Sequence, residues 1–410
     1  MHDGLSFRQM KFLEQIIYSS MKPKYRIVAV VAALFAFTTV LPAREINVEQ
    51  NVENLDITGF DGIVTRNDLK SSRTYISGKG NSLNPVLDIH VTKADSWNVR
   101  VETPGKNYDR LFSVSKSGSK LVFTVGQFRI RKRTGKEMLL RDVDGEEFLI
   151  SVPGDDVRIA VYVSIPAISS VDLSNFRSEV SFSGKFIGRS LDFKCSGMCT
   201  ARGLEGEWES SGLNFSGLSS VRNFNIKTSS MTFCTNGATS VKNMVFASEE
   251  MNLTLSGTSS ASSIDIEAGT LALNLSGSTI LKPSTLSVAN FRLNAAGVST
   301  YSATRAQVTG KASVMVSGSS SVVLDGKFNF VEARMSGVSN LTMSGNGEEM
   351  AISGTGSSSV RAKDLVMKNV TADMSGVSHC SITVLESLEK KTSYSATVEY
   401  FGNPKSVTEK

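Results

Sequence analysis

Apolar and polar residues alternate with a period of two over much of the chain beyond residue 170. In residues 251–255 and 271–275 every second position is Met or Leu. Such alternation is typical of strands that bury one face. A second short strand per unit is indicated by residues 224–226 and 264–266, which place Phe or Ile on either side of a polar residue. The pattern predicts an all-β region built from many short strands.

Glycine recurs at an almost constant spacing through the same region. The spacing is 20 residues from Gly197 to Gly297, and 19 to 21 residues from there to Gly376. The full series is Gly197, Gly217, Gly237, Gly257, Gly277, Gly297, Gly318, Gly337, Gly356 and Gly376. Glycine accepts a positive φ at a corner where a Cβ would clash. We therefore predict that each of these glycines is the structural turn of one rung in a repeat.

Two more columns appear when the chain is aligned on these glycines. Two residues after each glycine stands a hydroxyl residue, such as Ser219 or Ser259, or in one rung Cys199. Four residues after it stands a mostly aliphatic residue, such as Val221 or Val241. The hydroxyls are suited to bond the backbone of the turn and their counterparts one rung away. The aliphatic column is expected to point inward.

A single rung of this kind cannot bury its apolar face alone, so the rungs must stack. We predict a right-handed parallel β-helix, or solenoid, of about ten 20-residue rungs over residues 171–410. The right hand follows from the strong preference of parallel crossovers for that hand. At its end, residues 394–404 are expected to form a partial rung. Ala396 would take the place of the glycine and Tyr400 that of the inward residue.

Residues 44–170 are less regular and richer in charge than the repeat. We predict that they form an irregular antiparallel β meander that caps the solenoid, since the open end of a stack needs a cover. Strand-like runs are found at residues 86–91, 97–101, 120–125, 147–152 and 158–165.

Residues 21–43 have the pattern of a secretory signal peptide. A basic stretch at residues 21–26 precedes a run of 14 apolar or neutral residues at 27–40, and Ala43 is a small residue at the expected cut. Such a run is short for a transmembrane helix, although an uncleaved N-terminal anchor is an alternative. Residues 1–43 are thus assigned to an upstream extension and the signal. We predict an exported protein, in the periplasm or on the outer cell surface, that does not cross the membrane several times.

The formal net charge of +5 gives little reason to expect a nucleic-acid partner. Residues 1–43 account for +3 of it, which leaves about +2 for the remainder. A nucleic-acid-binding domain normally has a stronger basic excess. The acidic segment at Asp142 and Asp144 lacks the full spacing of a calcium loop. We interpret it as a hairpin tip that faces the basic run 129–133, which alternatively is a phosphate or polysaccharide patch.

The chain lacks the usual catalytic and cofactor motifs. It has no G-x-G-x-x-G, P-loop or G-x-S-x-G sequence. His90 and His379 are its only histidines outside the extension, and a hydrolase built on His379 is an alternative. The cysteines are scattered, and we interpret them as core or turn residues, with a Cys195–Cys199 bridge as the alternative in an oxidising compartment. We predict no catalytic residue, no metal and no cofactor.

Short motifs in a fixed order carry a resemblance to a known family. They are residues 57–63, 88–92 and 161–166, followed by the Ser-Gly-x-Ser rungs and closed by residues 400–404. In this order the chain resembles the putative auto-transporter adhesin, head GIN domain proteins of Bacteroidetes-type bacteria, over about residues 55–405. The resemblance implies a β-solenoid of the cell envelope or cell surface and carries no catalytic residues. The charged insertion at residues 129–147 departs from it.

The sequence therefore favours a non-catalytic binding, adhesion or scaffold module whose partner is an unknown glycan or protein at the cell envelope. Aligned exposed residues such as Asn214, Asn274 and Asn294 are candidate contacts, or alternatively a stabilising ladder. The alternative function is that of a carbohydrate-active enzyme, a polysaccharide lyase or hydrolase, which needs charged residues on neighbouring rungs. The charges here are scattered, as with Asp265 and Asp364, which stand five rungs apart.

Overall fold

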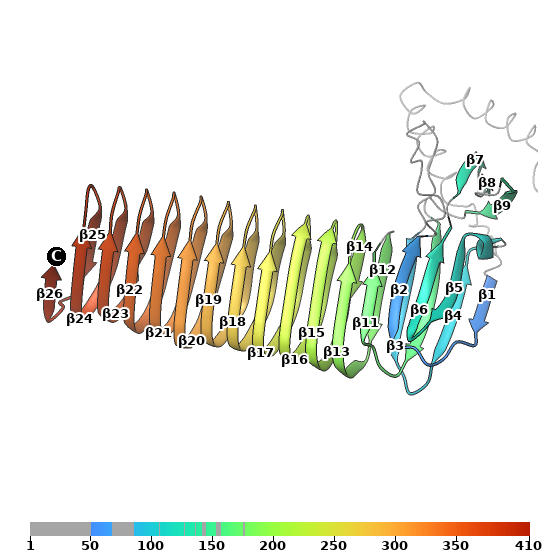
Figure 1. The fold of residues 1–410 in the computed structure, drawn as a ribbon, viewed down its shortest axis with the longest axis horizontal. Coiled ribbons are helices and arrows are strands. Elements are labelled where there is room, and N and C mark those ends of the chain that lie inside the picture. Colours follow the sequence, from blue (N-terminus) through green and yellow to red (C-terminus); the bar gives the residue numbers. More distant parts are fainter. Residues whose placement is uncertain are drawn as a thin grey trace, which may run out of the picture. The chain divides into compact units, whose positions relative to one another are not determined.

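The computed structural model describes residues 51–67, 86–105, 107–126, 128–135, 137–141, 145–152, 157–174 and 177–410. The predicted signal peptide and its cleavage site lie outside the described residues, as do Asp142 and Asp144. The described part forms a β-solenoid of about 12 turns with rungs of about 20 residues (Figure 1). The predicted solenoid fold is confirmed, and its right-handed winding stays a prediction.

From residue 185 onward each rung pairs in parallel with the next rung along the chain. The strands are β13 (Lys185–Cys195), β14 (Cys199–Arg202), β15 (Glu205–Gly217), β16 (Ser220–Gly237), β17 (Ser240–Leu255), β18 (Ser260–Leu275), β19 (Ile280–Ala295), β20 (Thr300–Val316), β21 (Ser321–Met335), β22 (Asn340–Gly354), β23 (Ser359–Met374), β24 (His379–Thr392), β25 (Thr397–Phe401) and β26 (Ser406–Glu409).

A rung is one long bent strand rather than the two separate short strands that the sequence predicted. In β17 the residue pairs 242–243 and 249–250 are exposed and interrupt the alternation of buried and outward residues. Asn243, in the first pair, has a φ of 55°. On either side of these bends the buried residues, such as Phe246 and Leu253, point into one continuous core.

The columns read from the sequence take the expected places. Four residues after the glycines the side chains are buried, as at Val221 and Val241. The hydroxyl column two residues after the glycines is also buried, and the Ser259 hydroxyl donates to the Ser256 carbonyl at 2.7 Å. Thr279 donates to the hydroxyl of Ser299 one rung away at 3.0 Å. The hydroxyls therefore bond both within their turn and between rungs. The ten glycines have φ values between 69° and 96°.

The N-terminal region combines antiparallel and parallel pairing. Antiparallel pairs join β1 to β4, β4 to β10, and β5 to β6. Parallel pairs join β2 to β6 and β11, and β3 to β10 and β12. The strands are β1 (Asn51–Leu55), β2 (Gly62–Asn67), β3 (Val86–Lys93), β4 (Asn98–Thr103), β5 (Phe112–Ser117), β6 (Lys120–Val125), β10 (Arg158–Ile165), β11 (Ser170–Leu173) and β12 (Ser178–Ser183), with a 3₁₀ helix η3 (Tyr108–Arg110).

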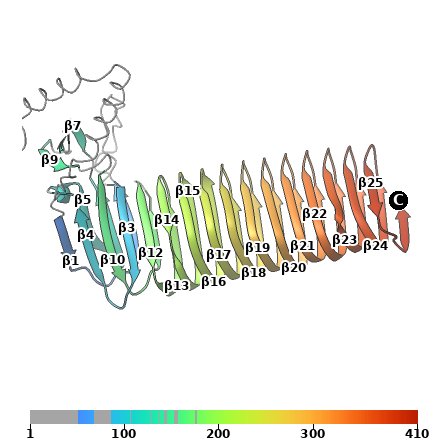
Figure 2. The ribbon, with the colours of Figure 1, turned by 180° about the vertical axis from the view of Figure 1, so that it is seen from behind.

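The parallel stack therefore begins before residue 171. Figure 1 shows the row β5, β6, β2, β11, β13, and Figure 2 shows the opposite row β1, β4, β10, β3, β12. The regular glycine series begins only at Gly197, so the spacing in the sequence reveals ten rungs while the solenoid has about 12 turns. The predicted antiparallel strands are present, but they lie at the outer edge of a parallel region.

The charged insertion forms a separate three-stranded antiparallel sheet of β7 (Arg129–Thr134), β8 (Glu137–Arg141) and β9 (Glu147–Ser151). Its side chains Met138, Leu140, Phe148 and Ile150 are buried and belong to the same hydrophobic cluster as the solenoid. The Arg131 guanidinium lies 3.4 Å from the Glu147 carboxylate, consistent with paired rather than free charge. These contacts support the proposal that the N-terminal region covers the end of the core.

The last partial rung has a different register from the predicted one. Tyr394, with a φ of 60°, occupies the glycine place, because the Ser395 amide donates to the Gly376 carbonyl at 3.0 Å. The strand register then pairs Cys380 of the inward column with Val398. The prediction that Ala396 and Tyr400 hold these two places is wrong by two residues. A terminal rung has a neighbour on one side only, so the sequence offers no following rung to align it with. The prediction placed the corner at the small residue Ala396, whereas the structure has it at Tyr394.

Candidate functional site

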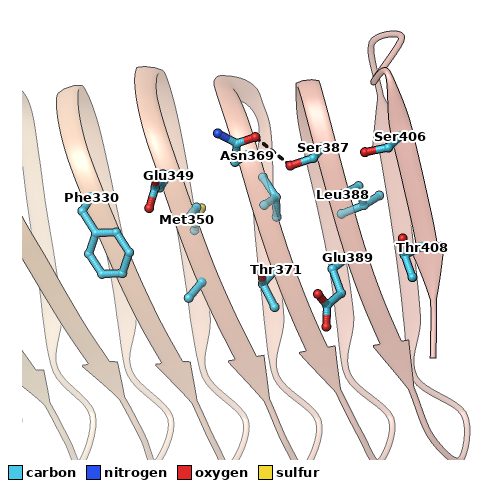
Figure 3. Close-up of a pocket in the computed structure, with 12 residues that line it drawn as sticks. Phe330, Glu349, Met350, Asn369, Thr371, Ser387, Leu388, Glu389, Ser406 and Thr408 are labelled. Atoms are coloured by element: carbon cyan, nitrogen blue, oxygen red, sulfur yellow. Dashed lines mark hydrogen bonds between the residues drawn. The ribbon is translucent and has the colours of Figure 1, made fainter.

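A shallow depression of about 240 Å³ crosses the outer face of the last rungs (Figure 3). Its wall is a row of register partners, one from each successive rung: Phe330, Glu349, Asn369, Ser387 and Ser406. The Ser387 hydroxyl donates to the Asn369 side-chain oxygen at 2.6 Å. Typical ligand pockets measure roughly 300–1,000 Å³, so this one is small for an enzyme site.

Two carboxylates line this depression, but their spacing does not suit glycoside hydrolysis. Glu349 and Glu389 lie two rungs apart and on adjacent outward columns, which places them about 12 Å apart from strand spacing and rise. Hydrolases need roughly 5–9.5 Å between the two groups. In addition, the Lys410 ammonium binds the Glu389 carboxylate. The depression therefore gives no support to the carbohydrate-active alternative.

Two of the remaining charged candidates from the sequence, Asp265 and His379, each have a side-chain hydrogen-bond partner. Thr285 donates to the Asp265 carboxylate at 2.6 Å, and Ser344 on the column of Asp364 donates to Asp325 at 2.7 Å. The His379 ring nitrogen Nδ1 lies 2.8 Å from the Thr397 hydroxyl on the next rung. None of these contacts builds a nucleophile with its base.

A cluster around His90 was missed by the sequence reasoning, since its members come from three strands, β3, β10 and β12, that are not consecutive in the chain. The Ser181 hydroxyl lies 2.9 Å from His90 Nδ1, and Asp88 lies 3.5 Å from His90 Nε2. The Arg158 guanidinium binds Asp88 at 3.1 Å and Glu179 at 3.0 Å. The hydrogen bond from Arg158 is the main cause that lowers the pKa of Glu179.

The residue types Ser181, His90 and Asp88 are those of a hydrolase triad, but the setting is unsuited to one. Asp88 is already bound to Arg158, and all three residues lie on an open sheet face. The backbone N–H groups around them are in parallel strand ladders, and an oxyanion hole needs free donors. We therefore interpret the cluster as a polar network that joins adjacent strands.

An outward column of cations begins next to this cluster. Arg202, Arg222 and Lys242 are direct register partners on three successive rungs. All three side chains are exposed. We call these three residues the basic column. It stands five residues after the corner glycines, a position at which the aligned sequence already shows it.

The predicted asparagine contacts lie on one outward column. Asn274 pairs directly with Asn294, whereas Cys234 and Thr254 stand between Asn214 and Asn274. All three asparagines are exposed. The one Asn–Asn hydrogen bond that the structure gives within residues 177–410 joins Asn243 to Asn223 at 3.2 Å. The ladder interpretation thus fits the bend at Asn243 better than it fits these three residues.

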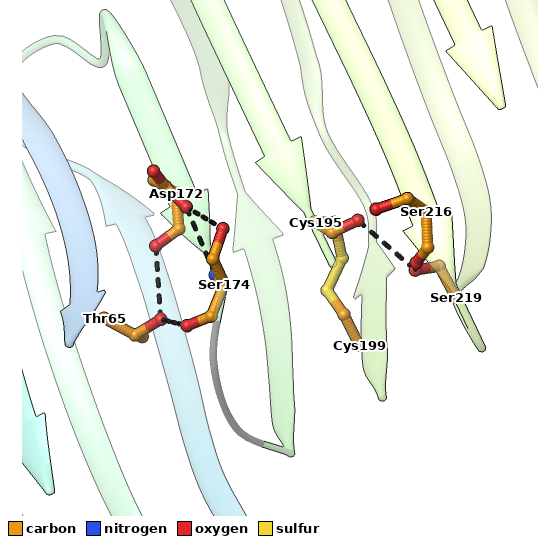
Figure 4. Close-up of a disulfide and its surroundings, with 7 residues drawn as sticks. All are labelled: Thr65, Asp172, Ser174, Cys195, Cys199, Ser216 and Ser219. Atoms are coloured by element: carbon orange, nitrogen blue, oxygen red, sulfur yellow. Dashed lines mark hydrogen bonds between the residues drawn. A yellow bond between two sulfur atoms is a disulfide. The ribbon is translucent and has the colours of Figure 1, made fainter. Parts of the chain in front are cut away.

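Cys195 and Cys199 form a disulfide across the first glycine corner (Figure 4). Their Cα atoms are 5.8 Å apart, and both residues are buried. The interpretation of these two as free core and turn residues is wrong, and the alternative bridge holds. The Ser219 hydroxyl donates to the Cys195 carbonyl at 3.3 Å, which ties the bridge to the next rung. Cys234 and Cys380 are free thiols.

The free thiols are expected to differ in reactivity, because the thiolate is the nucleophile. Burial raises the pKa of Cys380 to about 12, whereas Cys234 is only half-buried although its pKa is also raised by burial. Iodoacetamide should therefore label Cys234 first in the native protein, with Cys380 reacting only in denaturant. Peptide mass spectrometry should find Cys195 and Cys199 unlabelled until a reductant is added. Equal labelling of Cys234 and Cys380 in the native protein would contradict the packing.

The C-terminal rungs match the model of a known protein family. Residues 306–404 match the family model described as putative auto-transporter adhesin, head GIN domain. This match confirms the predicted resemblance over that segment. It falls on β21 to β25, together with parts of β20, and therefore covers the glycine corners from Gly318 onward and the depression of Figure 3 in large part. No curated protein is similar enough to this chain to count as a relative.

Three solved structures are similar to this chain over most of its length. A putative adhesin from Bacteroides fragilis is 10% identical, covers 88% of this chain and 94% of its own, and has a TM-score of 0.22. A putative adhesin from Parabacteroides merdae is 12% identical, covers 89% and 97%, and has a TM-score of 0.18. A putative lipid binding protein from Parabacteroides distasonis is 11% identical, covers 89% and 98%, and has a TM-score of 0.17. At these scores the superpositions carry no residue-level argument.

Two further findings concern membrane-spanning helices and metal sites among the described residues. None of their helices is long and apolar enough to cross a membrane. Among the same residues, no group of three or more His, Cys, Asp or Glu side chains is placed to hold a metal ion.

Proposed function

We propose that this protein is an exported, non-catalytic binding module of the cell envelope or cell surface, which acts in adhesion or as a scaffold. The observation that carries the proposal is the set of outward columns, such as the one through Asn274 and Asn294, which repeat in register at one-rung spacing. A stack of parallel strands holds such side chains at fixed intervals, about 4.8 Å apart. A ligand with its own repeat is a natural partner for such a face.

The family match supports adhesion as the purpose of the binding. The matched model is described as an adhesin head domain, and the signal-like pattern at residues 21–43 supports export. Glycans and proteins of the envelope remain the two partner classes, and the chain's near-balanced charge outside residues 1–43 argues against a general nucleic-acid binder.

Protease shaving of intact and lysed cells, read with an antibody to the rung region, tests where the module acts. Loss of the signal from intact cells supports a surface adhesin, and glycan and protein arrays would then identify the partner. Protection until lysis supports a periplasmic scaffold and contradicts adhesion. A signal confined to the cytoplasmic fraction would overturn export, and with it the proposed function.

A further inference from the structure

The basic column is an electrostatically unfavourable arrangement in the free protein. Arg202, Arg222 and Lys242 are directly opposite each other on adjacent parallel strands. Like charges at such cross-strand positions destabilise a sheet. Within the part of the chain that the structure describes, no carboxylate forms an ion pair with any of the three. Glu179 is a carboxylate on which the charge of Arg202 acts. Both of its oxygens, however, accept hydrogen bonds from Arg158, at 3.0 and 3.2 Å.

Elsewhere in the solenoid, several cations are paired with carboxylates on a neighbouring rung. Lys185 binds Glu207 at 2.6 Å, Lys368 binds Glu348 at 2.6 Å, and Lys311 binds Glu332 at 2.5 Å. Further pairs between rungs are Lys391–Asp373, Lys390–Glu409, Lys405–Glu386 and Lys410–Glu389. Pairing with a carboxylate on a neighbouring rung is thus one way in which this chain balances its cations. In the basic column three cations follow one another in register without such a carboxylate, and an external anion would relieve their repulsion.

Neutral polar groups flank the basic column. On the same sheet face, two residues earlier, stand the half-buried hydroxyl residues Thr200, Ser220 and Ser240. On the other side, at the bend of the rung, the Asn243 amide donates to the Asn223 side-chain oxygen. The surface therefore offers one cation per rung in a line, with hydroxyl and amide groups alongside.

The same column continues toward the N-terminal strands through Ser181, His90, Tyr162 and Arg100. The Arg100 guanidinium lies 4.4 Å from the centre of the Tyr162 ring, and the His90 ring stacks on Tyr162 at 4.8 Å. Because Arg100 and His90 are on the strands that flank Tyr162, both faces of its ring are covered. The Tyr162 ring therefore has no free face for stacking a nucleobase, the usual means of binding single strands.

We propose that the basic column binds an anionic polysaccharide that carries one carboxylate or sulfate per sugar unit and lies along the stack. This inference rests on the proposed function and names the class of ligand. The cations recur about every 4.8 Å, which is comparable to the length of one pyranose unit in an extended chain. Lys282, on the same column beyond Ser262, extends the line. A bilayer presents its charge over a plane, and only a narrow line of this face is basic.

The test compares two triple variants of the full chain that remove the same charge. Serine replaces each residue of the basic column, because Ser262 already occupies the next place in that column. The control removes three exposed cations from other columns. The column variant is Arg202→Ser, Arg222→Ser and Lys242→Ser. The control variant is Arg292→Ser, Arg305→Ser and Lys327→Ser.

The probes are polygalacturonate, with one carboxylate per sugar, and neutral dextran, measured by titration calorimetry. We expect the wild type to bind polygalacturonate but not dextran, and the column variant to lose at least about tenfold in affinity. The control variant should lose less than about twofold, and added salt should weaken binding of the wild type through screening. Matching circular dichroism spectra of the three proteins would exclude unfolding as the cause.

Other results overturn the inference in distinguishable ways. Equal losses in both variants would assign the binding to net charge and not to the column. Equally tight binding of duplex DNA or of phosphatidylserine vesicles by the wild type would mean that the ligand class is wrong. Binding of neutral glycans or proteins only would overturn the inference and leave the proposed function intact. A wild type that binds no glycan or protein on the arrays would remove both.

Discussion

Gly257→Val is expected to destabilise the solenoid by several kcal/mol. Gly257 has a φ of 73°, and a Cβ there would lie 2.6 Å from the Gly237 nitrogen and 2.7 Å from its carbonyl oxygen. These backbone atoms cannot move freely, since the Gly237 carbonyl accepts a hydrogen bond from Thr258 at 2.8 Å. Backbone strain of about 1–3 kcal/mol and overpacking of about 1–3 kcal/mol give a total of roughly 2–6 kcal/mol. Chemical denaturation followed by circular dichroism would measure it.

Gly197 provides the matched control, because it has the same corner conformation without the contact. Its φ is 75°, and a Cβ there would meet nothing within 4 Å. Gly197→Val should therefore show the cost of the positive φ alone, and the difference from Gly257→Val isolates the clash between stacked corners. Equal losses at both positions would mean that neighbouring corners do not constrain each other. A melting temperature of Gly257→Val within about a degree of the wild type would contradict the corner assignment altogether.

The repeat could be predicted from the sequence because each rung sees the same surroundings. A corner with positive φ selects glycine, the buried place two residues later selects a small hydroxyl, and the core selects an aliphatic residue. Each preference then recurs once per rung and becomes visible as a column, and Gly257, Ser259 and Ala261 are the members of the three columns in one rung. The mixed N-terminal region offers no such redundancy. There β10 lies between β4 and β3, so partners such as Tyr162 and His90 are far apart in the chain.

In the candidate site, too, the features that repeat from rung to rung could be predicted from the sequence, and those that depend on strand order could not. The basic column was present in the alignment, five residues after the glycines, but a charge balance summed over the whole chain conceals three cations on one line. The stack of Arg100 on Tyr162 and of Tyr162 on His90 depends on strand order, which local sequence patterns do not determine. Cys199 was read correctly as a member of the buried hydroxyl column, but that place also brings it within bonding reach of Cys195.

Two buried tyrosines are expected to respond to the loss of their hydroxyl with opposite signs. Tyr301 stands in the inward column and is completely buried, and its hydroxyl has no hydrogen-bond partner among the described residues. Tyr108 is equally buried, but its hydroxyl donates to the Ser151 carbonyl at 2.6 Å. Burial raises the pKa of both phenols, so both are neutral in measurements at neutral pH.

A buried polar group without a partner costs about 1–3 kcal/mol, whereas a typical hydrogen bond contributes about 1 kcal/mol. Tyr301→Phe should therefore raise the free energy of unfolding by about 1–3 kcal/mol, and Tyr108→Phe should lower it by about 1 kcal/mol. Both changes leave the ring in place, with Phe291 6.0 Å from the ring at position 301, so that packing is conserved. Urea denaturation of the wild type and the two variants would measure these changes in the free energy of unfolding. Destabilisation by Tyr301→Phe would show that the hydroxyl is satisfied inside the core, and that the inward column tolerates a polar group only where it is bonded.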